Sequence, residues 1–188
     1  MADDVATPDE KPREEVHKDV PSDEVAAAVC ERFPGTVFHD SHGQPVVYVE
    51  RAQWADVAAF LRDEQEFETC LDVCAVDHLT DVERMTVPGV QHERFEVVAS
   101  YISYARNRRV RAIAQVPARD TKIPSVALVF PGANFGERET YDLFGIQFEG
   151  HPDLTRILMP DDWEGHPLRK DDAPARVPVT FKGDPRPS

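Results

Sequence analysis

The chain has 188 residues and a formal net charge of −14, from 35 acidic against 21 basic side chains. This acidity argues against nucleic-acid binding, because affinity for phosphate comes from lysine and arginine. No apolar run approaches the roughly 20 residues of a membrane span, and the first residues lack the basic and apolar parts of a secretory leader, so we expect neither.

The predicted elements begin after a charged stretch. Residues 1–20 are rich in acidic residues and proline, and we expect them to form a disordered acidic tail. Ser22 is the expected N-cap of a first helix, which should end at Pro34-Gly35. Two short strands, 37–39 and 45–49, are predicted next, with a turn between them.

A second helix and several strands follow. Apolar residues at helical spacing predict this helix, namely Trp54, Val57, Ala58 and Leu61. Strands are expected over 70–78, 82–87, 94–103 and 109–116, with a hairpin loop between the last two. A period of two would place Cys70 and Cys74 on one face of the first of these strands. The other face would carry Leu71, Val73, Ala75 and Asp77.

Strands that cluster, rather than alternate with helices, predict the fold class. We expect an α+β fold of two layers, with helices packed on one face of a mixed β-sheet, followed by a long irregular C-terminal segment. Two more helical pieces, 125–130 and 133–144, should be broken at Pro131-Gly132, with Gly145 just after the second. The core domain would span 21–145, and a partner subunit is one way to cover its sheet edges.

The segment 146–172 has almost no periodicity, yet it carries charges of both signs and large apolar side chains. Long irregular runs inside a domain are usually functional, and apolar residues rimmed by charge are typical of protein interfaces. We predict a partner-docking segment here; the alternative is a loop packed on its own domain. Residues 173–188 contain four prolines and should form an extended tail, which either adds a strand to a neighbour's sheet or stays disordered.

Charged residues on the predicted helix 133–144 do not form a catalytic pair. Glu137 and Glu139 are two residues apart on a helix, so they point about 200° away from each other and do not converge on a substrate. We expect them, with Arg138, to form interface or internal salt bridges. Arg138 and Asp142, four residues apart, are the expected internal ion pair.

Two histidines have the same local sequence. His151 and His166 each stand between Glu-Gly and Pro, and they are 15 residues apart. Close-spaced zinc ligands usually lie two to five residues apart. We therefore interpret both as parts of rigid Gly-His-Pro turns rather than as metal ligands, in spite of nearby aspartates.

Trp163 is the expected anchor of the docking segment. Aromatic residues and arginine dominate interface hot spots, and Arg156, Arg169 and Lys170 would supply charged contacts around the indole. The alternative is that Trp163 is buried in its own domain.

The chain holds three cysteines, Cys30, Cys70 and Cys74, without a C-x-x-C spacing. An odd number favours reduced thiols over a disulfide framework, and three cysteines cannot ligate an iron–sulfur cluster that needs four.

The stretch 137–172 resembles the signature of a known family, the 30-kDa subunit of bacterial respiratory complex I, the proton-pumping NADH:quinone oxidoreductase. The matching pieces are Glu137-Arg138-Glu139, Tyr141-Asp142, Phe144-Gly145, Gly150-His151-Pro152-Asp153, Arg156-Ile157-Leu158 and the run 160–171. The upstream order of elements also suits the family, so the resemblance covers about 22–172. Thr155 departs from the pattern, because a basic residue is expected before Arg156.

The resemblance implies a subunit of the peripheral arm that lies against the quinone-site large subunit and near the iron–sulfur subunits. The complex passes electrons from NADH through FMN and iron–sulfur centres to quinone, and we expect these cofactors in partner subunits and none in this chain. The location would be peripheral, at the cytoplasmic face of the cell membrane. The expected partner-interface residues are Glu137, Arg138, Glu139, Tyr141, Asp142, His151, Asp153, Arg156, Asp161, Asp162, Trp163, His166, Arg169 and Lys170.

Two other hypotheses stay open. The chain could be the equivalent subunit of a related membrane-bound hydrogenase or of a complex with an electron donor other than NADH. It could also be a free-standing acidic adaptor domain. A free-standing enzyme has the least support, because the sequence shows neither a nucleophile–base set nor a phosphate-binding loop.

Overall fold

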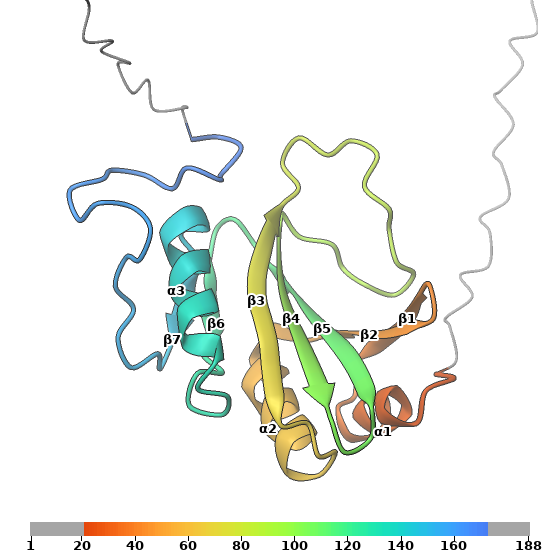
Figure 1. Ribbon diagram of the computed structural model, residues 1–188. Coiled ribbons are helices and arrows are strands. Elements are labelled where there is room, and N and C mark those ends of the chain that lie inside the picture. Colours follow the sequence, from red (N-terminus) through yellow and green to blue (C-terminus); the bar gives the residue numbers. More distant parts are fainter. Residues whose placement is uncertain (1–20, 173–188) are drawn as a thin grey trace, which may run out of the picture.

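A five-stranded mixed sheet lies at the centre of the computed structural model, which describes residues 21–172 (Figure 1). Its strands run in the order β1-β2-β5-β4-β3; β2 pairs with β5 in parallel, and the other neighbours are antiparallel. The strands are β1 Val37–Ser41, β2 Gln44–Val49, β3 Thr69–Asp77, β4 Phe95–Ser103 and β5 Arg108–Val116. The predicted α+β class with a mixed sheet is confirmed. The tails predicted at 1–20 and 173–188 lie outside the described residues.

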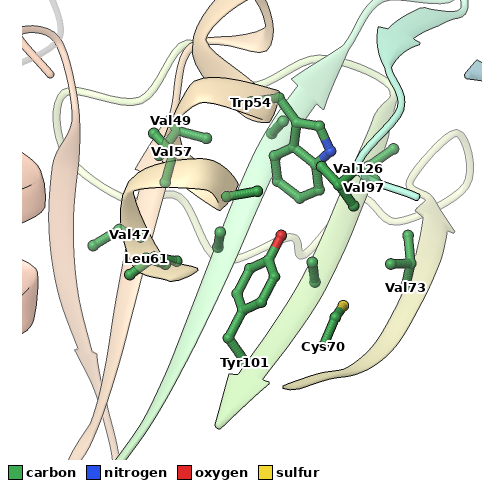
Figure 2. Packing of buried hydrophobic residues seen from close by; sticks show 14 of the residues in the cluster. Val47, Val49, Trp54, Val57, Leu61, Cys70, Val73, Val97, Tyr101 and Val126 are labelled. Atoms are coloured by element: carbon green, nitrogen blue, oxygen red, sulfur yellow. The ribbon is translucent and has the colours of Figure 1, made fainter. Parts of the chain in front are cut away.

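Two helices cover one face of this sheet. They are α1 Glu24–Arg32 and α2 Trp54–Asp63, the second preceded by the 3₁₀ turn η1 Arg51–Gln53. Trp54, Val57 and Leu61 of α2 are each at most 1% exposed, and Figure 2 shows them packed over the strands. Burial of an aliphatic side chain of this size contributes about 1.5–3 kcal/mol. The helical spacing predicted from the sequence is therefore the spacing of the core contacts.

The first helix has a different N-cap from the predicted one. Asp23 rather than Ser22 caps α1, because its carboxylate accepts hydrogen bonds from the amides of Val25 and Ala26 at 2.9 and 3.0 Å. Arg108 of β5 reaches the same carboxylate at 3.0 Å. The cap thus also ties the helix to the end of the sheet.

A β-bulge in β3 changes which side chains of that strand reach the core. The register with β4 shifts just after Cys70, so Cys70 is buried in the core while Leu71 is 49% exposed. Cys74 is exposed on the other face. The prediction that the two cysteines share a face is wrong, as is the placement of Leu71 on the same face as Val73, because an inserted residue shifts the period of two by one position.

Residues 82–87 form an irregular loop between β3 and β4 and not the predicted edge strand. The Arg84 side chain turns inward, donating to the Glu93 carbonyl at 2.6 Å and to the Glu96 carboxylate at 2.5 Å. These side-chain contacts, rather than a ladder to a neighbouring strand, hold the loop.

Residues 125–130 form hydrogen-bonded turns and not the predicted helical piece. The amides of Val129 and Phe130 both donate to the Val126 carbonyl, at 2.9 and 2.8 Å. Pro124 and Pro131 flank these six residues. Because proline restricts the residue before it and lacks an amide donor, the interval is too short for a helix.

The third helix, α3 Ala133–Phe144, lies along the edge of the sheet beside β3 (Figure 1). Thr140 donates through its hydroxyl to the Val73 carbonyl at 3.4 Å. At Gly136 the backbones come so close that a Cβ would lie 2.8 Å from the same carbonyl oxygen. The chain itself therefore covers the β3 edge, for which a partner was one proposed solution.

The helix ends at Gly145 as predicted, with φ of +73° and an amide that donates to the Tyr141 carbonyl at 2.8 Å. Beyond it, β7 Gln147–Glu149 pairs in parallel with β6 Lys122–Pro124 as a separate two-stranded sheet. The backbone from 150 to 172 is irregular, as expected.

Candidate partner-docking site

The ribbon, defined as residues 146–172, lies beside α3 and ends near the loop that joins β3 to β4 (Figure 1). Irregular backbone cannot satisfy its own amides as a helix or strand does, and buried amides without acceptors are costly. The contacts of the ribbon show how this chain supplies the acceptors.

Asp142 of α3 is the principal acceptor. One of its carboxylate oxygens accepts hydrogen bonds from the amides of Ile157, Leu158 and Met159 at 3.0, 2.8 and 2.9 Å. The other accepts from the Arg156 guanidinium at 2.6 Å. Burial alone would raise the pKa of Asp142, but these four donors outweigh it and lower the pKa to about 2. Asp142 is therefore a fixed anion inside the chain.

His166 and Arg156 hold a second part of the ribbon, around residues 165 and 166. His166 Nδ1 lies 2.9 Å from the Asp142 carbonyl oxygen, and Arg156 donates to the Gly165 carbonyl at 3.1 Å. A Cβ at Gly145 would lie 2.6 Å from the His166 ring, so the glycine leaves room for the imidazole as well as ending the helix. His166 thus belongs to a turn, as its sequence context predicted.

Arg138 joins α3 to the ribbon through Thr155. Its guanidinium donates to the Thr155 hydroxyl at 3.0 Å and to the carbonyls of Thr155 and Arg156, both at 3.2 Å. The predicted ion pair between Arg138 and Asp142 does not form, because Arg156 takes the Asp142 carboxylate. Thr155, where the family resemblance leads us to expect a basic residue, serves here as an acceptor.

The far end of the ribbon is held by a second buried carboxylate, which the sequence patterns did not indicate as part of the site. Asp77, at the end of β3, accepts from the Lys170 amide at 2.9 Å and from Arg94 at 2.7 Å. Arg94 also binds Asp171 at 2.6 Å, and this contact holds the pKa of Asp171 well below its usual range. The Asp172 carboxylate accepts a hydrogen bond from the His166 amide.

Glu137 and His151 form a buried group beneath the start of the ribbon. Glu137 is paired with the Ser125 hydroxyl at 2.5 Å and accepts from the Val126 amide at 2.6 Å; burial outweighs these contacts and raises its pKa to about 7. His151 Nδ1 accepts from the Asp153 amide at 3.0 Å, and its Nε2 lies 3.9 Å from Glu137. Both side chains are 0% exposed, so they brace the fold.

The outward face of the ribbon is apolar in patches. Leu158, Leu168 and Ile157 are 58%, 44% and 38% exposed, and Phe135 of α3 is 61% exposed. Trp163 is half-buried, between the two interpretations offered for it. These apolar side chains are exposed to solvent, while the backbone that carries them binds the rest of the chain through its polar groups.

The predicted interface residues therefore divide into two groups. Those that point inward or bind within the chain are Glu137, Arg138, Asp142, His151, Arg156, His166 and Arg169. Those that lie exposed are Glu139, Asp153, Asp161, Asp162 and Lys170, with Tyr141 and Trp163 half-buried. As a correction, the Glu137 and Asp142 side chains are enclosed by their own chain, because each satisfies amides that the irregular backbone leaves without partners.

Within residues 21–172, no group of three His, Cys, Asp or Glu side chains is arranged to hold a metal ion. No helix in that same range is long and apolar enough to cross a membrane.

Comparison with known proteins assigns the chain to a class of respiratory-chain subunits. The model of a family described as the 30-kDa subunit of respiratory-chain NADH dehydrogenase matches residues 47–177. The chain belongs to this family.

Relatives of the chain share a name as NADH-quinone oxidoreductase subunits. The one from Salinispora tropica is 42% identical over 168 residues, which are 86% of this chain and 65% of that protein. The chain thus spans a little under two thirds of that relative. The one from Geobacter sulfurreducens is 42% identical over 81% of this chain and 91% of its own length.

Solved structures are similar to the chain, and two of them serve as examples. One is Nqo5, as a trypsin-resistant fragment (1–134), with a TM-score of 0.60 and 32% identity; the match covers 69% of this chain and 96% of that one. The other belongs to an archaeal membrane-bound sulfane sulfur reductase, with a TM-score of 0.64 and 22% identity over 86% of this chain and 94% of that one, and it shows a shared fold.

Proposed function

We propose that the chain is a non-catalytic peripheral-arm subunit of NADH:quinone oxidoreductase, and that its ribbon positions the quinone-site subunit. Membership of the 30-kDa subunit family supports the assignment of the chain to this complex. The observation that carries the role is the ribbon itself, whose backbone is bound inward by Asp142 and Asp77 while Leu158 and Leu168 face outward.

A pre-anchored ribbon is suited to docking for an energetic reason. Association costs conformational entropy whenever loops and side chains become ordered, and a surface that is already ordered avoids much of that cost. Three amides on one carboxylate fix the backbone around Leu158 before any partner arrives. Binding energy then comes from covering the exposed apolar side chains and the half-buried Trp163.

Under this proposal the redox chemistry belongs to neighbouring subunits, which would hold FMN and the iron–sulfur clusters. The environment of Cys70 agrees with the proposal that the clusters are bound by other subunits. Cys70 is enclosed in the core, and burial raises the pKa of its thiol to about 12, so it is a poor thiolate ligand. We place the assembled subunit at the cytoplasmic face of the membrane.

The test is assembly in a strain that produces the whole complex. Leu158→Asp and Trp163→Ala should each lower the amount of assembled complex on native gels at least several-fold, because a charge or a cavity is placed at the apolar contact. Leu128→Asp is the matched control, since Leu128 is 74% exposed and belongs to the turns before α3 rather than to the ribbon. It should assemble normally.

Two readouts decide the outcome. Circular dichroism of each purified variant should show an unchanged fold, so that a loss of assembly is a loss of contact. If Leu158→Asp complexes keep their full subunit content but lose quinone turnover alone, the ribbon has a catalytic role and the proposal is wrong.

A related complex with a different electron donor is a second candidate, because the archaeal reductase subunit shares the fold over 86% of this chain. Purification of the native complex discriminates the two. Bound flavin and NADH oxidation in the same particle support the first candidate, and their absence supports the second.

A further inference from the structure

The sheet face opposite α1 and α2 carries a transverse groove that the ribbon does not reach. The groove measures about 140 Å³ and runs across the sheet from Gln44 and Pro45 of β2 to Leu71 of β3. Ser100 lies between, beside Arg109 and Arg111 of β5. The bulge in β3 is what turns Leu71 outward to line it.

The strand register explains why these residues meet. Arg111 pairs across the sheet with Ser100, which pairs with Asp72, so the three lie in one row of the open face. Arg109 lies in the next row, opposite Ile102. At about 3.3 Å per residue, two guanidinium-bearing residues two positions apart on a strand are about 7 Å apart.

The two arginines are unusual in this acidic chain. Within the described residues, the side chain of neither Arg109 nor Arg111 makes a hydrogen bond or an ion pair, whereas most other arginine side chains there bind a carboxylate or a carbonyl, as those of Arg51, Arg94 and Arg156 do. Asp72 stands at the end of the same row without pairing to Arg111. Each guanidinium therefore keeps five donors available for another molecule.

Local charge decides what such a groove can bind. At physiological ionic strength charges are screened beyond about 8 Å, so a ligand in the groove meets the two arginines and the nearby carboxylates of Asp72 and Asp40 rather than the net charge of −14. Of these groups, the two arginines line the groove itself. The half-buried Ile102 and the exposed Leu71 add apolar contact beside them. The complement is an acidic segment that also carries apolar side chains.

We propose that this groove docks an acidic segment of another subunit of the complex, with two carboxylates that bind Arg109 and Arg111, whose backbone positions are about 7 Å apart. The inference rests on the proposed function, because it requires that the chain is part of a complex with other subunits. It concerns a second contact, on the sheet face rather than on the ribbon.

Site-specific crosslinking in the native complex tests the proposal. A benzophenone amino acid at Ser100 should trap a peptide of another subunit that contains at least two Asp or Glu residues within four positions. Arg109→Glu with Arg111→Glu should lower the crosslink yield about tenfold or more, because like charges then face each other. Arg109→Lys with Arg111→Lys should keep the yield within a few-fold.

The matched control is Arg119→Glu, since Arg119 is exposed on the turn after β5 and lies outside the groove. It should leave the crosslink unchanged. The proposal is overturned if the trapped peptide is a second copy of this chain, its own residues 1–20 or a segment without paired carboxylates, or if no crosslink forms.

The outcome is separable from the test of the proposed function. Subunit content of the wild-type complex tests the proposed function alone. A complex that contains this subunit, yet gives none of the expected crosslink at Ser100, refutes the groove contact and leaves the ribbon contact standing.

Discussion

The sheet core and the ribbon are two ordered regions of one chain, held by different forces. In the core, regular ladders satisfy the backbone and apolar side chains such as Leu61 and Val97 fill the interior. In the ribbon there is little ladder, and Asp142 and Asp77 receive its amides instead. The difference teaches that a carboxylate, which offers about four acceptor positions, can replace secondary structure where the backbone must stay irregular.

The two kinds of contact also differ in specificity. Apolar contacts tolerate adjustment, whereas a hydrogen bond to a buried charge has a narrow range of distance and angle. The Asp142 contacts, between 2.6 and 3.0 Å, therefore fix one conformation of the segment around Leu158. A docking surface needs that uniqueness more than it needs additional stability.

The largest effect should come from the core. Leu61→Ala removes a side chain that is 0% exposed, and we expect the global free energy of unfolding to fall by about 2–5 kcal/mol through lost burial and a cavity. Urea unfolding followed by circular dichroism measures it. Leu158→Ala, at a position 58% exposed, should change the same quantity by less than about 0.5 kcal/mol. Equal losses would show that the ribbon is part of the same core.

A more local effect should follow from removing the ribbon anchor. Asp142→Ala leaves three amides and Arg156 without their acceptor, a loss of about 2–4 kcal/mol. Hydrogen exchange at Ile157, Leu158 and Met159 should accelerate about 30- to 1,000-fold, while amides of β4 accelerate much less. Asp161→Ala, at an exposed position of the ribbon, is the control and should leave all these rates unchanged. Uniform acceleration across the sheet would contradict the separation of the two regions.

The smallest effect concerns the buried carboxyl between the two regions. The pKa of Glu137 is about 7 in the folded chain, above its ordinary 4.5, so the native state holds this proton more tightly than the unfolded chain does. The stability that it contributes is complete below about pH 4.5 and is lost as the pH rises through 7, with a total of roughly 1–3 kcal/mol.

Glu137→Gln should remove that dependence. At pH 8 the variant should be roughly 1–3 kcal/mol more stable than the wild type, because a neutral amide can still pair with Ser125 and Val126, and at pH 5 the two should agree closely. Glu139→Gln, two positions on and exposed, should match the wild type at both pH values. Parallel stability curves for Glu137→Gln and wild type from pH 5 to 8 would refute the assignment.

The sequence predicted those parts of the fold whose cause is local. The spacing of Trp54, Val57 and Leu61 is a property of one helix, and the structure confirms it. The bulge after Cys70 could not be predicted, because the choice between two registers depends on the packing against β4. The position of α3 at the sheet edge likewise depends on the approach of Gly136 to Val73, 63 residues earlier in the chain.

The sequence predicted the bounds and the irregular backbone of the ribbon, but it did not predict which side chains bind it. Asp142 was expected to bind Arg138 at helical spacing, and instead binds Arg156 and three amides, because the ribbon brings one guanidinium and three otherwise unpaired amides to this carboxylate. Asp77 meets Lys170 across 93 residues, a distance that no local pattern spans. One indication was present: a carboxylate at an inward position of a strand must find a partner.

The helix beside β3 has a consequence for how the molecule meets its surroundings. A bare outer strand is a template on which further chains can polymerise, and α3 occupies that template with its own backbone against Val73. Any companion that approaches from this side meets a helix and its attached ribbon, and recognition there must proceed through side chains rather than through continuation of the sheet.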